Sequence, residues 1–453
     1  MVQVAVFAAV YTGYGLVRFT TGRTNSWDLV IFDQAVRSYS TFHGPISPIK
    51  GIRAGYGMDF NLLADHFSPI LAALAPLYWL HDGPRTLIVA QAVLFAVSAV
   101  PLWFIAERTL GRRAAGFVVF AYLLSRPLWE ALAVDFHETA FAPLLFLCMA
   151  ERWQAGRRWQ ALAVGSLLLL VKEDAGLLLV GFGLFLLTQR GQRRPAALFI
   201  LVGLAGTLAA ARLVIPFFGG DPSYYWAYGD FGPDPLSAAA HAVTHPQDVV
   251  TALFTPSEKP TTVVLLLAPL LFLPLRSPQV LVVVPLLLER MLADSWPNWW
   301  SIQFHYNAFL VAPLFVAAID GAARLTAHPA PSRLAPTLNT ATRWWPPAIA
   351  LTAVALLPFT PIDALANPAF YRTTEHAAAA KEAARQIPSG ATVDAHGSVG
   401  PFLTHRTRVL LWDNTPHPAP WLIVDTTRPP TPVIPPTCHL TWHRHGYEVH
   451  HCP

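Results

Sequence analysis

Residues 159–188 read WQALAVGSLLLLVKEDAGLLLVGFGLFLLT, two apolar arms on either side of the charged triplet Lys172-Glu173-Asp174. Each arm has about 12–15 residues, roughly 18–22 Å of helix, which is too short to cross a hydrocarbon core of about 30 Å. One long helix would bury three charges at mid-membrane and place two neighbouring basic loops on opposite sides, which the positive-inside rule disfavours. We therefore predict that the chain turns at the triplet, which then lies below the membrane surface in a polar cavity.

The composition indicates a polytopic membrane protein. The chain has 453 residues, 54% of them hydrophobic and 13% charged, whereas a soluble chain carries about a quarter charged residues. The net charge of +4 does not indicate nucleic-acid binding, because the basic residues stand in short clusters between apolar runs rather than on one face. A cytosolic enzyme, a disordered chain and a nucleic-acid binder are therefore excluded.

Eleven apolar runs are candidate membrane spans. They are 2–19, 86–106, 114–128, 138–151, 160–171, 174–188, 195–216, 262–275, 278–290, 306–324 and 344–360. The run 67–80 is too short to span and contains two prolines, so we expect it to be re-entrant or interfacial. Arg residues concentrate in the loops near 108–113, 152–158, 190–194 and 324–343. These loops share one side only if 67–80 does not cross, which predicts about eleven spans in the cell membrane, a cytoplasmic N-terminus and an extracytoplasmic C-terminus.

The chain divides into a predicted transmembrane domain, residues 1–360, and a predicted soluble extracytoplasmic domain, residues 361–453. The outer side of the first domain carries the loops 20–85, 217–261 and 291–305. The tail has a helical pattern at 373–386, strand patterns at 391–394, 408–412 and 421–424, and a hairpin that turns at His445-Gly446. Alternating helix and strand favours a small α/β domain. The expected fold class is an all-α polytopic membrane protein with a small α/β C-terminal domain.

Cys438 and Cys452 flank the predicted hairpin. An exported domain permits a disulfide between them. The same segment also holds His439, His443, His445, His450 and His451. These imidazoles allow a metal site instead, and the sequence leaves both alternatives open.

A second charged tip, Asp135-Phe136-His137-Glu138, lies between the short arms 114–128 and 138–151 and repeats the arrangement of the triplet. Ionisable residues at membrane depth are costly and indicate a functional site. The alternative for the first tip is that Lys172 and Glu173 pair with each other in a structural turn. Two recessed tips on the same side favour the functional interpretation.

The first outer loop contains the helix start Asn25-Ser26-Trp27-Asp28 and an amphipathic stretch after it, which predicts a helix in the membrane interface. Asp28 is either a functional carboxylate or an acid that stabilises the helix N-terminus. Asp33 lies about 140° further around the helix, so the two carboxylates are not expected to share a ligand. His66, at the end of this loop, is either structural or a ligand.

The later outer loops combine aromatic and polar residues, among them Gln303, His305 and Tyr306. Such residues anchor a protein at headgroup depth, and aromatic faces beside carboxylates also suit sugar rings. No P-loop, dinucleotide-binding glycine fingerprint, zinc-binding HExxH or CxxC pair is present, so ATP-driven transport has no support in the sequence.

The motifs of both tips and both loops resemble those of a bacterial and archaeal membrane-protein family of unknown function (DUF 2079). The matching motifs are Trp27-Asp28, Phe32-Asp33-Gln34, His66-Phe67-Ser68-Pro69, Asp135-Phe136-His137-Glu138, Lys172-Glu173-Asp174, Gln303–Tyr306 and Val424-Asp425. The wider architecture resembles the GT-C glycosyltransferases, which use polyprenyl-phosphate-linked sugars and carry a catalytic acid in the first outer loop. Asp28 occupies that position, as a lone carboxylate between Trp27 and Leu29.

The resemblance implies a polyprenyl-phosphate-dependent glycosyltransferase with an extracytoplasmic acceptor. Asp28 is the candidate base and Asp33 a second acidic candidate, while Lys172 and His137 would stabilise the leaving phosphate. The remaining candidates for substrate binding are His66, Glu173, Asp174, Gln303, His305 and Tyr306. Asp135, His137 and Glu138 would alternatively hold a divalent cation. The competing hypothesis is a membrane transporter or lipid flippase that uses the recessed ionisable residues as a relay.

Overall fold

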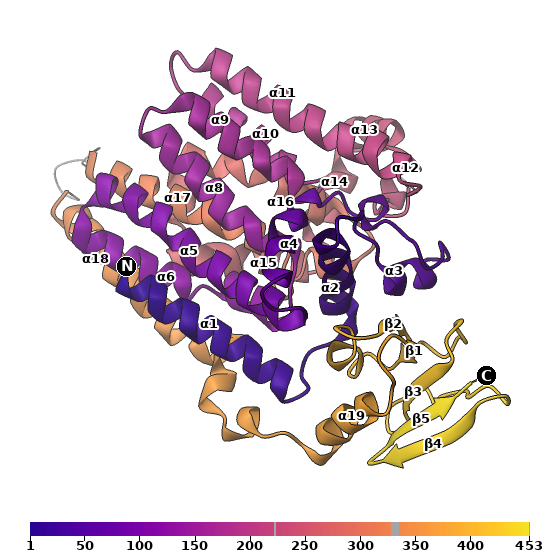
Figure 1. Ribbon diagram of the computed structural model, residues 1–453. Helices are drawn as coiled ribbons and strands as arrows, with labels where there is room; N and C mark the ends of the chain where they lie inside the picture. Colours follow the sequence, from indigo (N-terminus) through magenta and orange to yellow (C-terminus); the bar gives the residue numbers. More distant parts are fainter. Residues whose placement is uncertain (222, 328–334, 453) are drawn as a thin grey trace.

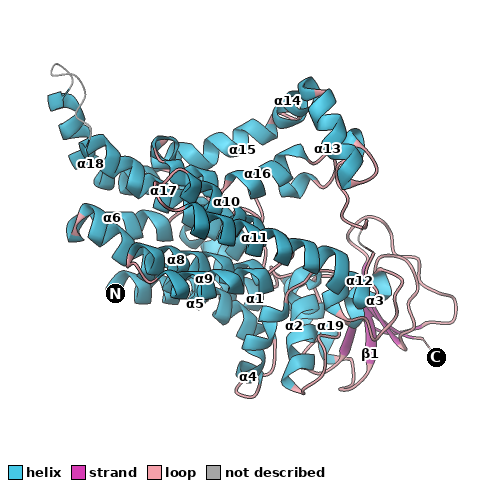
Figure 2. Cartoon of the chain, turned by 90° about the horizontal axis from the view of Figure 1, so that it is seen from above, coloured by secondary structure: helices cyan, strands magenta, loops and turns pink. Residues whose placement is uncertain are grey.

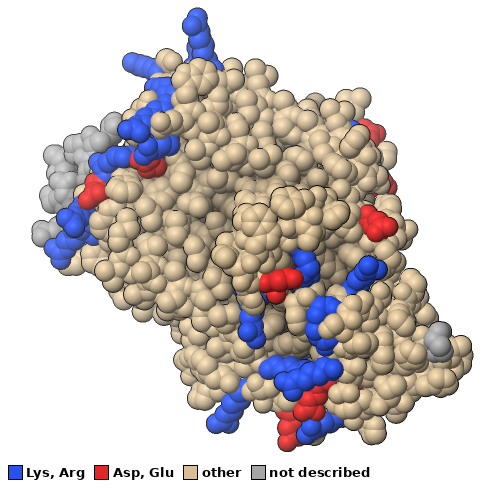
Figure 3. All heavy atoms as spheres, in the orientation of Figure 1, with Lys and Arg blue, Asp and Glu red and all other residues tan. Residues whose placement is uncertain are grey.

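The computed structural model describes residues 1–221, 223–327 and 335–452, and most of these residues form a bundle of membrane-length and shorter helices (Figure 1). Five helices of the described part are long and apolar enough to cross a membrane: Val2–Thr20, Pro84–Leu110, Arg112–Ala133, Arg193–Phe217 and Ala308–Leu325. Shorter apolar helices are Pro69–Tyr78, Arg158–Leu170 and Gly176–Leu187. Figure 3 shows charged side chains gathered at two opposite ends of this face, with a broad uncharged band between them. A polytopic membrane protein has this distribution of charge.

The main helices of the bundle are α1 (Val2–Thr20), α5 (Pro84–Leu110), α6 (Arg112–Leu123), α7 (Arg126–Ala133), α8 (Phe141–Gln154), α9 (Arg158–Ser166), α10 (Gly176–Leu187), α11 (Arg193–Ala209), α15 (Glu258–Leu267), α16 (Val284–Leu292), α17 (Ala308–Ala327) and α18 (Ala335–Ala355). A helical pair, α13 (Pro235–Thr244) and α14 (Pro246–Phe254), lies at one edge of the bundle in Figure 2, where α14 contacts α15 and α16. The basic stretch expected near 324–343 falls partly on residues outside the described ones.

The turn at the charged triplet is confirmed. Helix α9 continues as a 3-10 turn to Leu170, the chain reverses, and α10 begins at Gly176. Helix α10 then packs tightly on α11: a Cβ atom at Gly176 would lie 2.6 Å from the carbonyl oxygen of Gly203. Close backbone contact of this kind is how helices associate where no hydrophobic effect drives them together.

The arm before the second tip is longer than predicted. Helices α6 and α7 carry it to Ala133, which makes 22 residues. Residues 126–133 look too polar for a span, but the ion pair between Arg126 Nε and Glu130 Oε1 (2.8 Å) joins two charges on one helix face, and Trp129 is fully buried. Because Arg126 and Glu130 neutralise each other and Trp129 is buried, placing this segment in an apolar environment costs less free energy than its polar sequence indicates.

The expected spans 262–275 and 278–290 are broken rather than continuous. After α15 the chain forms three 3-10 turns, Ala268–Leu270, Leu273–Arg276 and Pro278–Val282, before α16 begins at Val284. Prolines at 269, 274, 278 and 285 remove helical donors at each break. The run 67–80 forms a 3-10 turn, Pro69–Leu74, and the one-turn helix α4 (Ala75–Tyr78), so it is too short to span.

The tail forms α19 (Glu375–Arg385) and a five-stranded mixed sheet at one end of the bundle (Figure 1). The strands are β1 (Thr392–Ala395), β2 (Arg408–Leu411), β3 (Trp421–Asp425), β4 (His439–Arg444) and β5 (Tyr447–His451). Their order is β2-β1-β3-β5-β4, with β2, β1 and β3 parallel and the last two antiparallel. The hairpin turns at His445-Gly446, both with positive φ, and a disulfide joins Cys438 to Cys452.

Helix α2 (Ser26–Ser40) lies between the bundle and the sheet, and ten of its 15 residues are buried. Gln34 Nε2 donates to the carbonyl of Val409 in β2 (2.9 Å), and Ser26 Oγ donates to the carbonyl of Gly397 (2.8 Å). The predicted helix after Asn25 is therefore present, and the C-terminal segment packs against it at Ser26 and Gln34. This enclosure fixes the rotation of α2, on which the candidate site depends.

Candidate active site

A cavity of about 860 Å³ lies at the sheet end of the bundle, and Asp413 of the C-terminal tail is part of its lining. Its walls come from segments far apart in the sequence, the ends of α1 and α7, the start of α2, both charged tips and the loops near 50–66, 224–225 and 296–306. Among the sequence-predicted residues, the lining includes Asp28, His66, Asp135, His137, Glu138, Lys172, His305 and Tyr306. The fold therefore gathers both tips and the first loop in one place.

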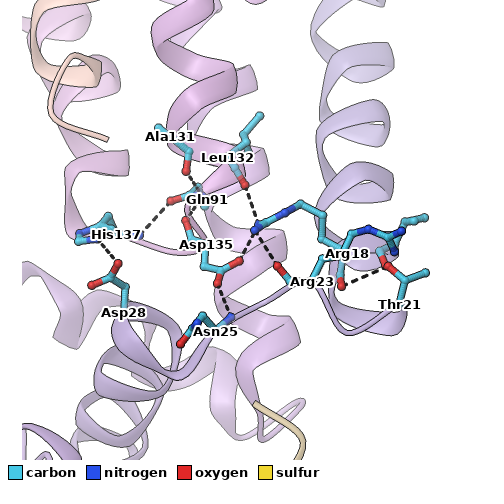
Figure 4. Close-up of polar contacts among 11 residues, drawn as sticks. Arg18, Thr21, Arg23, Asn25, Asp28, Gln91, Ala131, Leu132, Asp135 and His137 are labelled. Carbon is cyan, nitrogen blue, oxygen red and sulfur yellow. Dashed lines mark hydrogen bonds and ion pairs between the residues drawn. The ribbon is translucent and has the colours of Figure 1, made fainter. Parts of the chain in front are cut away.

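Asp28 and His137 both line this cavity and point toward each other (Figure 4). The side chain of Asn25 caps helix α2 by accepting from the Trp27 amide (3.3 Å), so Asp28, in the first turn, is not the cap. Its Oδ2 lies 3.0 Å from His137 Nε2, and the Asp28 side chain is 38% exposed. The first turn of α2 thus presents an accessible carboxylate to a buried imidazole.

His137 lies in the loop between α7 and α8. Its Nδ1 is 3.3 Å from Glu138 Oε2, and its ring stacks on His305 with centroids 3.3 Å apart. Burial opposes protonation, but the charges and contacts of Asp28 and Glu138 outweigh it and raise the pKa of His137 to about 9. The neighbouring His305 has a pKa well below its usual value, because of burial and the charge of His137. One imidazole of the stack is therefore charged at neutral pH and the other is not.

Asp135 is an anchor for the loop that carries His137. Its carboxylate binds Arg18 Nη1 at 2.6 Å and accepts from the Asn25 amide at 2.8 Å, and its φ is +68°. Gln91 Nε2 donates to the Asp135 carbonyl (2.7 Å), while Gln91 Oε1 accepts from the His137 amide (3.0 Å). Figure 4 shows this network tying α1, α5 and the start of α2 to the loop.

The three residues considered for a divalent cation do not assemble into a metal site. The Asp135 carboxylate is engaged by Arg18 and Asn25, while Glu138 contacts the other side of the His137 ring. Within the described ranges, no group of three His, Cys, Asp or Glu side chains is arranged to hold a metal. This also holds for His450 and the other histidines of the C-terminal tail that were considered as metal ligands.

Lys172 lines the cavity and is 6% exposed. In the part of the chain that the structure describes, its ammonium has no ion-pair partner within 4 Å and lies 5.5 Å from the Tyr306 ring centroid. Glu173 instead pairs with His66 Nδ1 (2.7 Å) and accepts from the Phe67 amide (3.1 Å). The alternative, in which Lys172 and Glu173 pair with each other in a structural turn, is therefore wrong. The Lys172 side chain lines the cavity instead.

Four predicted residues do not line the cavity. Glu173 and Asp174 lie behind Lys172, where Asp174 Oδ2 is 3.9 Å from Arg290 Nη2. Gln303 is exposed to solvent. Asp33 is 0% exposed and binds Arg37 (2.8 Å), the Tyr78 hydroxyl (2.7 Å) and the Thr404 hydroxyl (2.8 Å). Asp33 therefore joins α2 to α4 and to the C-terminal segment.

Sequence reasoning missed several cavity residues. Lys50 Nζ pairs with Asp65 Oδ1 (2.9 Å), which also accepts from the Tyr225 hydroxyl (2.7 Å). Arg53 stacks over the Trp27 ring (3.8 Å to the centroid) and pairs with Asp413 Oδ2 (3.6 Å). The one available signal was the scarcity of lysine, which makes Lys50 and Lys172 two of only four in the chain.

Two solved structures of ArnT from Cupriavidus metallidurans match nearly the whole chain. The one bound to undecaprenyl phosphate has a TM-score of 0.54 at 14% sequence identity, and the match covers 99% of this chain and 97% of that one. The apo structure gives a TM-score of 0.53 at 13% identity with the same coverage. The oligosaccharyltransferase AglB from Archaeoglobus fulgidus gives 0.42 at 11% identity, covering 94% of this chain and 69% of that one.

These likenesses concern the fold, because the identities are low. The predicted fold class, a helical polytopic membrane protein of GT-C-like architecture with a small α/β C-terminal domain, is confirmed by the ArnT match. No curated protein matches the sequence. The model of the DUF2079 family of predicted membrane proteins matches residues 22–430. The chain belongs to this family, as its motifs indicated.

Proposed function

We propose that the protein is an integral membrane glycosyltransferase of GT-C type, which transfers a sugar from a polyprenyl-phosphate donor to an extracytoplasmic acceptor. The observation that carries the proposal is the presence in one cavity of an accessible carboxylate, Asp28, and a buried lysine, Lys172, that has no carboxylate within 4 Å among the described residues. Glycosyl transfer needs a base on one side of the sugar and positive charge on the side of the departing phosphate. The ArnT fold supports the same substrate class, since one ArnT structure holds undecaprenyl phosphate.

The residues divide the reaction between them. Asp28 accepts the proton of the acceptor hydroxyl while the oxygen of that hydroxyl forms a bond to the anomeric carbon of the sugar. The bond from that carbon to the phosphate oxygen breaks, and the electron pair leaves with the polyprenyl phosphate. Lys172 stabilises the departing phosphate. His137 orients Asp28 through the 3.0 Å contact, while Glu173 holds His66 at the cavity wall.

The proposal is tested by comparing the cell-envelope glycans and glycolipids of a strain that lacks the protein with those of the same strain given wild type or Asp28→Asn. A sugar that is lost, restored by wild type and not restored by the variant supports transfer and identifies the product. Both proteins must be present in the membrane at equal amounts. An unchanged glycan profile in all strains contradicts the proposal and favours the transporter or flippase.

We further propose that the sheet end of the bundle, with residues 361–453 as a separate domain, lies outside the cytoplasm. The Cys438–Cys452 disulfide supports this orientation, because disulfides persist in oxidising compartments. The basic loops that precede α9 and α11 lie at the opposite ends of these helices from the cavity tips, as the positive-inside rule requires.

The orientation predicts the labelling of single cysteines in a Cys148→Ala background. Thr415→Cys, at an exposed position near the sheet, is expected to react on intact cells with a membrane-impermeant maleimide. Arg193→Cys, at the exposed start of α11, is expected to react only after the cells are opened. The reverse pattern would place the sheet in the cytoplasm and contradict the extracytoplasmic acceptor.

His137 predicts an alkaline limit to activity. Because its pKa in the folded protein is raised to about 9, the imidazolium is present below this pH and is lost as the pH rises through it. The rate of transfer is expected to fall above about pH 9. His137→Asn is expected to lower the rate at neutral pH about tenfold and to abolish this alkaline decrease in the pH–rate profile. His43→Gln, at an exposed position outside the cavity, is the control and is expected to show the same alkaline decrease as wild type. If His137→Asn shows the same alkaline decrease as wild type, a group other than His137 causes it.

A further inference from the structure

A second cavity, of about 430 Å³, lies on one face of the C-terminal sheet. The alternation of the strands gives the sheet two different faces. Val393, Ala395 and Ile423 belong to the main hydrophobic core of the molecule, while Leu422 and Val424 form a small separate cluster with Trp412. The cavity opens on the face with the small cluster, and the segments 412–420 and 435–438 contribute residues to its lining.

Asp394 is on this face, together with Leu422 and Val424 of β3 and their partners His450 and Glu448 of β5. Asp394 lies in β1, between β2 and β3 and beside Leu422 of β3, and is 2% exposed. Its Oδ2 accepts from His417 Nδ1 at 2.8 Å, whereas its Oδ1 has no hydrogen-bond partner among the described residues. A buried carboxylate oxygen without a partner is costly, and the packing of a small sheet does not require a charge there.

The cavity also offers an unused donor. Trp412 is 7% exposed and lines the cavity, and its Nε1–H has no partner within the described part of the chain. Around it, Pro416, Pro418 and Pro420 present rigid apolar walls. Proline has a fixed φ, so these walls lose little entropy when a ligand is bound. An apolar pocket with a few convergent polar groups is the usual form of a small-molecule site.

Asp394 and His417 are the ionisable residues in the lining of this cavity. Burial raises the pKa of Asp394, and the hydrogen bond to Asp394 raises that of His417. Both shifts favour a proton held between the two groups at their 2.8 Å contact. The same segment borders the large cavity, because Asp413 lines it and pairs with Arg53. His417 Nε2 lies 3.9 Å from Asp413 Oδ1. The segment that contains Asp413 and His417 therefore contributes to the lining of both cavities.

We propose that this second cavity binds one sugar ring of the acceptor. Asp394 accepts a hydrogen bond from a ring hydroxyl, the Trp412 indole donates to a second oxygen, and the prolines contact the C–H face of the ring. A hydroxylated ring fits because each hydroxyl both donates and accepts, so one ring can meet both the unpaired Asp394 oxygen and the unpaired Trp412 donor. The proposal deepens the proposed function and rests on it for the identity of the ligand as part of an acceptor.

Saturation-transfer NMR on the full-length protein tests this proposal. The protein is held in nanodiscs or in a detergent that contains no sugar, since maltoside detergents would compete. The probes are the methyl glycosides of glucose, galactose, mannose and N-acetylglucosamine, with tetrahydropyran as the ring without hydroxyls. We expect saturation transfer to at least one glycoside and none to tetrahydropyran. Each of Asp394→Asn and Trp412→Phe is expected to weaken binding about fivefold to tenfold.

Matched variants make the result decisive. Thr415→Ala, in the same segment but outside both cavities, is expected to bind as wild type does. If Asp394→Asn fails to fold, Trp412→Phe, which keeps an aromatic ring in place, decides. No transfer to any glycoside, or equal transfer in both cavity variants and wild type, overturns the proposal whatever the outcome of the glycan comparison.

Discussion

Asp28→Asn is expected to lower the rate of sugar transfer by about a thousandfold and to leave the stability of the protein nearly unchanged. A positioned general base contributes about 10²–10⁴ to a rate, and the amide that replaces Asp28 accepts no proton. The stability is spared because Asn25, and not Asp28, caps helix α2, and because the Asp28 carboxylate is partly exposed with His137 as its one ion-pair partner among the described residues. The measurements are the transfer rate in membranes and the thermal unfolding of the purified protein.

Asp33→Asn is the matched control, since the same chemical change is made five residues along the same helix. Asp33 is fully buried and binds Arg37, Tyr78 and Thr404, so its replacement is expected to cost about 2–4 kcal/mol of stability. Any loss of activity should then follow the loss of folded protein. Unfolding of Asp28→Asn, with Asp33→Asn left intact, would make Asp28 the structural residue and remove it from the mechanism.

Lys172→Gln is expected to reduce kcat/KM for the polyprenyl-phosphate donor by about a hundredfold or more. Removing one preorganised group that stabilises developing negative charge costs about 10²–10³ in rate, and Lys172 is the buried cation of the cavity that has no ion-pair partner in the described residues. Lys172→Arg keeps the positive charge and is expected to retain at least about ten times the activity of the Gln variant. Equal activity of the two variants would mean that charge at this position does not assist the departing phosphate.

Lys259→Gln separates this effect from the general cost of altering a buried lysine. Lys259 is 2% exposed, but it lies outside the cavity and donates to the carbonyls of Ala252 and Ala293, both at 2.8 Å. Its replacement is expected to lower the unfolding temperature without changing the KM for the donor. Thermal unfolding and donor titration, measured on the same preparations, distinguish the two lysines.

Local chemistry made the tips and the tail predictable. The turn at Lys172-Glu173-Asp174 follows from the cost of charge in a bilayer, and the hairpin at His445-Gly446 follows from two residues that tolerate positive φ. The separation of Asp28 from Asp33 was equally predictable, because the angle between them depends only on the geometry of a helix. The length of the arm 112–133 was not predictable, since the Arg126–Glu130 pair and the buried Trp129 stabilise a segment that reads as polar.

The sequence by itself determined the membrane class, the places where charge is concentrated and the family to which the chain belongs, because hydrophobic runs and motifs are local properties. The tertiary structure alone decided which of these charges meet. Asp28 and His137 are 109 residues apart in the chain, and their contact depends on the Arg18–Asp135–Gln91 network that holds the loop. Burial of α2 under the C-terminal sheet sets the rotation that turns Asp28 into the cavity and Asp33 away from it. Long-range packing of this kind leaves no periodic pattern in a single sequence.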